Sequence, residues 1–410
     1  MQLKDASPAQ NTRFLDPSTP PTLFTLTFVA AMAAVSMNVF LPSLPGMARY
    51  FQADYHLIQL SVALYLFVNG ALQLVVGPLS DRYGRRPIIL SGFAIYIIAT
   101  FGCIVAPDVY SFLAFRMMQA TVAVGMVLSR AAIRDMVPGD QAASMIGYVT
   151  MGMSVVPMLA PGLGGLLDQH YGWKASFWLQ SLTGLMALAL LWRDMGETAQ
   201  RQFDGFAAQF RAYPSLLMSP RYWGYCLTAT LTSGAFFAYL GGAPYVGSEI
   251  YGMEPSRLGY FFGAPAAGYF AGNFLSGRFA VRVGMIRMIF AGAIITAFGM
   301  ITAMVIFALG GGSEYIFFGA MILVGLGNGV TLPSANAGIM SVRPELAGSA
   351  IGLSGTLMMI GGAGVSAFAG FALGDGMSPM PLLWVMLTSA LLAVIVMLGV
   401  IRRERRLGVS

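Results

Sequence analysis

The sequence predicts an all-α membrane protein with twelve transmembrane helices arranged as two six-helix bundles. Composition is the first reason, because 57 % of the residues are hydrophobic, only 10 % are charged, and the mean hydropathy is +0.72. These values lie outside those of ordinary soluble domains. The second reason is that apolar runs of about twenty residues, long enough to cross about 30 Å of hydrocarbon, recur along the chain. A spacing pattern shared by the two halves is the third.

The apolar runs give twelve predicted spans, which are residues 22–43, 57–79, 87–106, 112–134, 145–167, 174–193, 222–244, 257–280, 285–308, 314–337, 347–371 and 380–401. A polar stretch divides the first six from the last six. The predicted organisation is an amino-terminal arm (1–21), a bundle (22–193), a linker (194–221), a second bundle (222–401) and a basic tail (402–410). Within the linker, Phe203, Phe206 and Phe210 predict a short amphipathic helix on the membrane surface.

The cations predict the orientation of these spans. If the amino terminus is cytoplasmic, most of the 23 lysines and arginines lie on the cytoplasmic side, as the positive-inside rule expects. That rule explains the basic pI of about 9.4 without a nucleic-acid partner. The first twenty residues lack the apolar core of a cleaved secretory signal, so we expect a disordered cytoplasmic arm and both termini in the cytoplasm.

The chain offers no pattern that predicts a cofactor or a metal. Its two cysteines, Cys103 and Cys226, fall inside predicted spans three and seven. A disulfide framework or a metal site is therefore not expected.

The two halves share a spacing of glycine and arginine. Gly77, Arg82 and Gly84 end span two, and Gly277, Arg282 and Gly284 end span eight. Gln73 and Asn273 correspond by the same displacement of 200 residues. Parallel repeats of this kind build one large class of secondary transporter, whose substrate site lies between the halves.

The turn after span two is the most highly charged short stretch. We expect Asp81 to lie near the positive amino-terminal end of span eleven, and Arg82, Arg85 and Arg86 to face acidic groups. Such a latch would be intact in one conformation of two rocking bundles and broken in the other.

The order of residues in this turn resembles the loop signature of the major facilitator superfamily; the matching residues are Gly77, Leu79, Asp81, Arg82, Gly84, Arg85 and Arg86. Three segments resemble, more closely, the Bcr/CflA-type drug exporters of that superfamily: VFLPSLPGMARYF, RMMQATVAVGMVLSRAAIRDMV and VPMLAPGLGG. The resemblance implies the major facilitator fold in a bacterial cytoplasmic membrane. It also implies efflux of small amphipathic compounds, usually in exchange for protons.

The last of these segments resembles the antiporter motif of span five. Pro157 and Pro161 each remove a backbone donor and are expected to kink the helix, while Gly164 and Gly165 let another helix pack closely. A kinked helix of this kind can seal one side of a cavity.

One position departs from the exporter pattern. The group typically carries an aspartate where this chain has Asn38, and no acid falls near the middle of any span. An intramembrane carboxylate is the ordinary proton carrier, so its loss weakens the expectation of proton antiport. The cation that remains within a span is Arg116, which is either structural, bonded to carbonyls and to Asn38 or Gln119, or a site for an anion.

The expected substrate cavity combines uncharged polar groups with aromatic and sulfur side chains, a mixture that suits amphipathic ligands. Its predicted residues are Met37, Asn38, Tyr65, Asn69, Gln73, Arg116, Gln119, Phe236, Tyr239, Phe261, Tyr269, Asn273, Asn328 and Asn336.

The leading functional hypothesis is a monomeric exporter of small amphipathic compounds that works by alternating access and proton antiport. The alternative is a facilitator or exchanger of an organic anion or neutral metabolite, with Arg116 as its site. An enzyme is not expected, because the spans contain no His, Asp or Glu near their centres.

Overall fold

The computed structural model describes residues 12–137, 139–199, 213–343, 346–373 and 378–407, and over these residues the chain is helical without strands. The first half contains α1 (Leu23–Asn38), η1 (Leu41–Ser43), α2 (Leu44–Phe51), α3 (Tyr55–Tyr83), α4 (Arg85–Val105), α5 (Val109–Gln119), η2 (Ala120–Val122), α6 (Ala123–Met136), α7 (Gly139–Tyr171) and α8 (Lys174–Asp194). The second half contains α10 (Pro220–Tyr245), η3 (Val246–Ile250), α11 (Pro255–Phe261), α12 (Ala264–Val283), α13 (Met285–Ala308), α14 (Glu314–Val342), α15 (Ala347–Leu373) and α16 (Met380–Leu407).

The helices fit a membrane. In the described part of the chain, 10 helical stretches are long and apolar enough to cross a bilayer. The seventh and eighth predicted spans correspond to α10 and to α11 with α12, which are richer in glycine, tyrosine, serine and threonine. Together these helices confirm the predicted twelve-span fold.

Three predicted spans are not single helices. In span one, helix α1 ends at Asn38, and the chain continues through η1 into α2. Pro42 and Pro45 in these two elements supply no backbone donor. Span four changes to a 3₁₀ turn at η2, and span eight breaks before Pro265 at the start of α12. In contrast, α7 continues as one helix through both of its prolines.

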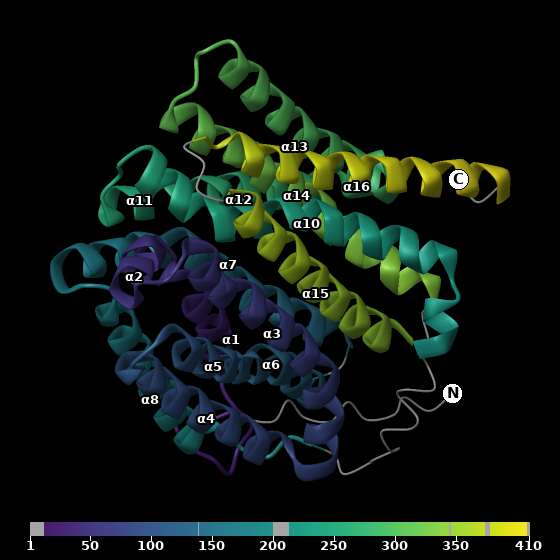
Figure 1. Cartoon of the computed structure of the whole chain (residues 1–410). Helices are drawn as coiled ribbons and strands as arrows, with labels where there is room; N and C mark the ends of the chain where they lie inside the picture. The colour runs from purple at the N-terminus through teal and green to yellow at the C-terminus, as the bar shows by residue number, and fades with distance from the viewer. Residues whose placement is uncertain (1–11, 138, 200–212, 344–345, 374–377, 408–410) are drawn as a thin grey trace.

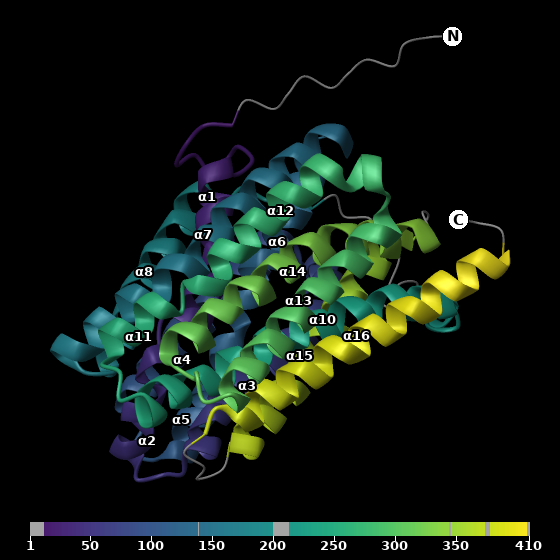
Figure 2. The ribbon, with the colours of Figure 1, turned by 90° about the horizontal axis from the view of Figure 1, so that it is seen from above.

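The helices form an N-bundle (α1–α8) and a C-bundle (α10–α16), which lie side by side in two views (Figure 1, Figure 2). The two most extensive helix pairs between them are α15 on α3 and α11 on α7, with smaller contacts of α12 with α7 and of α10 with α3. The two most extensive pairs are spans two with eleven and five with eight, so the bundles meet along both sides of their interface.

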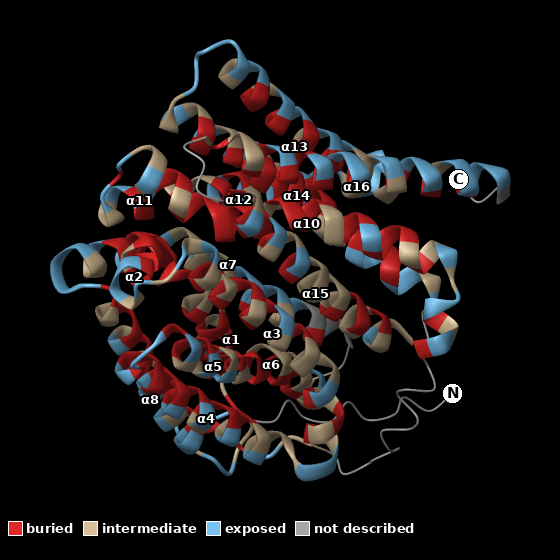
Figure 3. Ribbon diagram, in the orientation of Figure 1, coloured by how far each residue is buried: buried red, intermediate tan, exposed pale blue. Residues whose placement is uncertain are grey.

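Buried residues, red in Figure 3, run through both bundles, and at one end of the molecule they form a single core shared by the two. We call this the far end; it carries α2 and α11. One hydrophobic core there includes residues of both bundles, such as Phe40 and Phe112 with Tyr239 and Phe318. We call the opposite end, where α3 turns into α4, the motif end. There the N-bundle and the C-bundle have separate cores.

The arm before α1 is held in place by Asp194 at the end of α8. The fully buried carboxylate of Asp194 accepts hydrogen bonds from the backbone N–H of Leu15 (2.7 Å), and from the N–H and hydroxyl of Thr22 (both 2.9 Å). Residues 12–22 are therefore anchored, where the sequence predicted a disordered arm. The predicted amphipathic helix around Phe203, Phe206 and Phe210 lies outside the described residues.

Candidate functional site

Arg116 lies in a closed box of side chains inside the N-bundle. Its guanidinium donates to the carbonyl oxygen of Ser36 (2.9 Å), the Ser36 hydroxyl (3.2 Å) and Oε1 of Gln119 (2.8 Å). The rings of Phe40 and Tyr65 lie on it, each with its centroid 4.2 Å from Cζ. Arg116 is 1 % exposed. Carbonyl oxygens and aromatic faces are the partners that let a charged group stay buried.

The box confirms Gln119 as a partner of Arg116 but not Asn38. The Nδ2 of Asn38 donates to the carbonyl oxygen of Ala34 (2.8 Å) within its own helix. Gln119 is itself oriented by its Nε2, which donates to the Thr100 hydroxyl (2.7 Å).

The helix that carries Arg116 begins at a capping box. The carboxylate of Asp108 accepts hydrogen bonds from the backbone N–H groups of Tyr110 and Ser111. The Ser111 hydroxyl in turn accepts the backbone N–H of Asp108. The pKa of Asp108 lies below its usual value because the backbone N–H of Ser111 bonds the ionised form. This start fixes the face of α5 that presents Arg116 to Ser36.

Two smaller polar groups lie where the bundles meet. In α3, Nε2 of Gln73 donates to Oδ1 of Asn69 (2.9 Å). In the C-bundle the Ser233 hydroxyl lies 3.2 Å from Oδ1 of Asn328 and 3.6 Å from the sulfur of Met358. Half-buried Met358 and Met359 pack against the far-end core, and a Cβ on Gly70 of α3 would lie 2.9 Å from Met359.

The predicted cavity residues divide into three groups by exposure. The buried ones are Asn38, Tyr65, Asn69, Arg116, Gln119, Tyr239 and Asn328. The half-buried ones are Met37, Gln73, Phe236, Phe261, Tyr269 and Asn273, and the exposed one is Asn336. Buried residues with internal partners serve packing in this conformation, so the half-buried group is the better candidate for contact with a bound molecule.

The charged turn at the motif end ties three helices of the N-bundle together. Arg85 forms ion pairs with Asp81 and with Asp135 (3.0 Å), and also donates to the Ser80 hydroxyl. These residues come from the end of α3, the start of α4 and the end of α6. Asp81 therefore pairs with Arg85 in this conformation and not with the start of α15.

Glu197, which lies beyond α8, closes the same turn from outside. Its carboxylate accepts the backbone N–H of Arg85 (2.8 Å) and of Arg86 (3.3 Å). Gly84 makes this approach possible, since a Cβ there would lie 2.4 Å from Oε2 of Glu197. Sequence spacing gave no indication of this contact, because 112 residues separate Glu197 from Arg85.

Gly84 and Gly284 share an unusual backbone conformation. Their φ and ψ angles are 99° and 151°, and 90° and 145°, a region that only glycine adopts readily. The repeat inferred from residue spacing therefore has the same geometry in both halves. The C-bundle copy has no acids at the positions of Asp81 and Asp135.

The glycines of α7 allow close approach of backbones at the far end. A Cβ on Gly164 would lie 1.6 Å from the carbonyl oxygen of Val39, and one on Gly165 would lie 2.1 Å from that of Pro255. The second contact joins the two bundles. It is what the glycines of the antiporter-type motif were predicted to allow.

Polar contacts also cross between the bundles at the far end. The Tyr55 hydroxyl donates to the carbonyl oxygen of Gly241 (2.7 Å), and Nε2 of Gln59 donates to that of Ser366 (2.7 Å). Arg49 and Glu249 form an exposed ion pair (2.7 Å). Sequence analysis missed Gln59, although a fully buried glutamine near the start of a span is an uncommon feature.

A family model for the Major Facilitator Superfamily matches residues 26–366. The chain belongs to this superfamily. It is a membrane transporter by descent, and the predicted loop signature in the turn at Asp81 is confirmed as a mark of this family.

Relatives within the superfamily include proteins named for drug resistance. The chain is 31 % identical to the chloramphenicol resistance protein of Pseudomonas aeruginosa, over 78 % of this chain and 76 % of that protein. It is 27 % identical to a bicyclomycin resistance protein homolog of Haemophilus influenzae (83 % and 86 % covered) and 28 % identical to multidrug resistance protein D of Escherichia coli (83 % and 86 %). These relatives confirm the resemblance to the Bcr/CflA-type exporters.

Solved structures share the fold. A bacterial homolog of the human lysosomal transporter Spinster, in an inward-facing and occupied conformation, superposes with a TM-score of 0.72 at 18 % identity, over 93 % of this chain and 96 % of that one.

Among the described residues no group of three or more His, Cys, Asp or Glu side chains could hold a metal ion.

Proposed function

We propose that this superfamily member is a secondary transporter that exports small amphipathic compounds from the cytoplasm by alternating access. The observation that carries the proposal is the asymmetry of the cores. The bundles share one core at the far end and have separate cores at the motif end. Such an arrangement can exchange one closed end for the other by rocking about the interface.

The proposed orientation places the motif end and both termini in the cytoplasm of a bacterial inner membrane. Arg82, Arg85 and Arg86 lie at that end, as do the arginines from Arg402 to Arg406 in α16. The positive-inside rule supports this placement. In that orientation the less tightly joined end faces the cytoplasm, the side from which an exporter collects its substrate. Both bundles belong to one chain, so a monomer suffices.

The proposed contact surface for substrate lies between α3 and the C-bundle. It combines the amide of Gln73 with the flexible sulfur side chains of Met358 and Met359 and the ring of Phe236, all half-buried. Adaptable apolar groups with a few hydrogen-bonding atoms accommodate compounds of different shapes.

Proton antiport remains the leading proposal for coupling, although Asn38 cannot titrate. The acids that Arg85 joins, Asp81 and Asp135, change their surroundings if the turn moves. These two acids are therefore the proposed proton-linked groups.

The alternative of an anion exchanger with Arg116 as its site finds less support. Arg116 is buried, bonded to Ser36 and Gln119, and packed against the rings of Phe40 and Tyr65. An incoming anion would have to displace these partners.

The experiment is uptake of labelled amphipathic compounds into proteoliposomes, with and without an imposed pH gradient. We expect accumulation against a concentration gradient only when the pH gradient is present. If the labelled compounds equilibrate across the membrane at a rate that does not depend on the pH gradient, proton antiport is refuted and the protein is a facilitator. Absence of transport for a broad panel of compounds by inserted, folded protein would refute the export proposal.

A further inference from the structure

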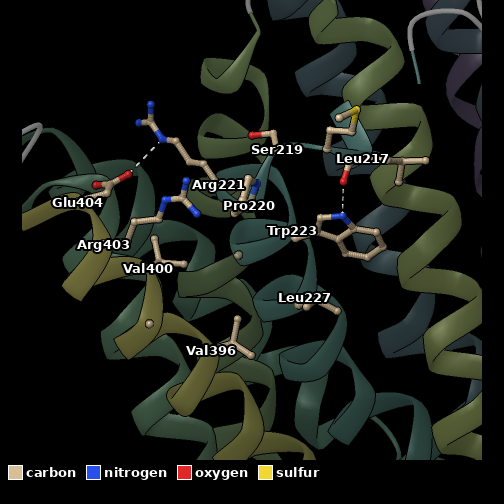
Figure 4. Close-up of a pocket in the computed structure, with 13 residues that line it drawn as sticks. Leu217, Ser219, Pro220, Arg221, Trp223, Leu227, Val396, Val400, Arg403 and Glu404 are labelled. Carbon is tan, nitrogen blue, oxygen red and sulfur yellow. Dashed lines mark hydrogen bonds and ion pairs between the residues drawn. The ribbon is translucent and has the colours of Figure 1, made fainter. Parts of the chain in front are cut away.

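A pocket of about 610 Å³ lies at the motif end, between the start of α10 and the end of α16 (Figure 4). Arg221, Arg403 and Glu404 lie at one end of it, and Leu227 and Val396 lie toward the other. The pocket is therefore amphipathic along its length. The proposed transport function does not use it.

The charged end of the pocket carries more positive than negative charge. Glu404 is buried, pairs with Nε of Arg221 (3.0 Å) and accepts the Tyr225 hydroxyl (2.9 Å). Arg403 is exposed and forms no hydrogen bond or ion pair with the described residues. The single carboxylate is thus already engaged, and a guanidinium is left available for an anion.

The indole of Trp223 marks the level of the membrane surface. Its Nε1 donates to the carbonyl oxygen of Leu217 (2.7 Å), which fixes the ring in the pocket wall. Tryptophan is enriched at the depth of lipid headgroups. The apolar part of the pocket then continues toward the hydrocarbon.

Gly399 leaves open space in the pocket that a lipid acyl chain could occupy. A Cβ on Gly399 would meet no atom within 4 Å, so this stretch of α16 borders open space. Leu227 and Val396 flank the same space and are accessible.

We propose that this pocket binds an anionic phospholipid, with its phosphate between Arg221 and Arg403 and an acyl chain along Leu227, Val396 and Gly399. Guanidinium groups bind phosphate oxygens in paired, charge-assisted bonds. The apolar wall favours a lipid over free phosphate, which would gain nothing from it. The cytoplasmic leaflet, where the proposed orientation puts this pocket, supplies anionic lipids.

The test measures lipid retained by the purified full-length protein in detergent, by native mass spectrometry with added phosphatidylglycerol or phosphatidylcholine. We expect preferential retention of phosphatidylglycerol. Arg403→Gln should weaken it about tenfold, the effect of losing one charge-assisted contact. Arg406→Gln removes the same charge from the same helix end outside the pocket, and should change retention little.

A second variant tests the acyl-chain wall without touching charge. Gly399→Leu places a side chain in the open space, so phosphatidylglycerol retention should fall while the protein remains folded, as its unfolding temperature without added lipid would show. Equal retention of both lipids, or equal losses in Arg403→Gln and Arg406→Gln, would overturn the proposal. The proposal would also be overturned if millimolar inorganic phosphate displaced the lipid and Gly399→Leu left phosphatidylglycerol retention unchanged. The pocket would then be a simple anion site.

Discussion

Arg116 is a guanidinium kept inside a helix bundle without a carboxylate beside it. Its charge is balanced by the Ser36 carbonyl, the Gln119 amide and the faces of Phe40 and Tyr65. The sequence predicted a cation within a span that is either structural, bonded to carbonyls and to Asn38 or Gln119, or a site for an anion; the structure gives the partners as the Ser36 carbonyl and Gln119. The sequence could not predict Phe40 and Tyr65, because their position depends on how α1 and α3 pack on α5.

Replacing Arg116 by alanine should destabilise the N-bundle by about 3 kcal/mol or more, because it leaves buried acceptors unpaired and two rings without a neighbour. The measurement is the unfolding temperature in detergent. Arg116→Lys keeps the charge but loses the planar guanidinium group, so its stability should lie between that of the wild-type protein and that of Arg116→Ala. A normal unfolding temperature in Arg116→Ala, together with selective loss of anion transport, would contradict the structural role.

Asp81 is expected to act on movement and not on substrate affinity. Asp81→Asn leaves Arg85 paired with Asp135, so the turn should stay folded while its charge balance changes. We expect several-fold slower turnover in proteoliposomes with binding affinity little changed. Affinity that falls in parallel with turnover would show that Asp81 belongs to the binding surface instead.

At the scale of helices and turns, periodic apolar runs predicted where the spans lie but not where they break. The breaks at η1 and before α12 coincide with prolines, Pro42 and Pro265, whereas the 3₁₀ turn at η2 contains none. Gly164 and Gly165 were predicted as places of close approach, and the structure gives them definite neighbours, the carbonyl oxygens of Val39 and Pro255. Contacts such as Glu197 with the turn at Arg85 carry no local signal in the sequence.

Four glycines of the two repeats allow strain and steric effects to be separated. Gly284→Ala meets no atom but forces an unfavourable φ, which should cost about 1–3 kcal/mol. Gly84→Ala adds a collision with Glu197 and should cost more. Gly77→Ala and Gly277→Ala meet neither obstacle and should be close to neutral.

The four variants are compared by thermal unfolding of the purified protein. Glu197→Ala should remove the collision. In that background, the loss of stability caused by Gly84→Ala should be close to the loss that Gly284→Ala causes in the wild-type protein, because only the backbone strain remains. If Gly77→Ala proved as harmful as Gly84→Ala, the contact between the turn and Glu197 would not be the cause.

Across the whole molecule, the interface between the bundles is uneven, and Gln59 is a fully buried polar group within it. Its amide bonds Ser366 in α15 and lies against Gly241 of α10. The twelve-span fold and the repeat followed from the sequence. The end at which the bundles are closed did not, because one sequence must support both conformations of a transporter.

Gln59→Ala should shift the population toward opening of the far end. Spin labels at positions 52 and 248, one on each bundle, would report this as a longer and broader distance distribution. The native cysteines are buried and should label poorly. Gln180→Ala removes a buried glutamine that contacts only the N-bundle, so it should leave the distances unchanged. A similar shift in both variants would point to general loosening.

The far-end core has an electrical consequence as well as a mechanical one. An energised membrane keeps a voltage across a few nanometres, and any continuous file of water through a transporter would discharge it. The packed rings of Phe112, Phe177, Tyr239 and Phe318 form an apolar layer on that side, which an ion could cross only by losing most of its hydration. In the proposed transport cycle, the same residues that hold the two bundles together would thus also keep the membrane electrically sealed at the far end.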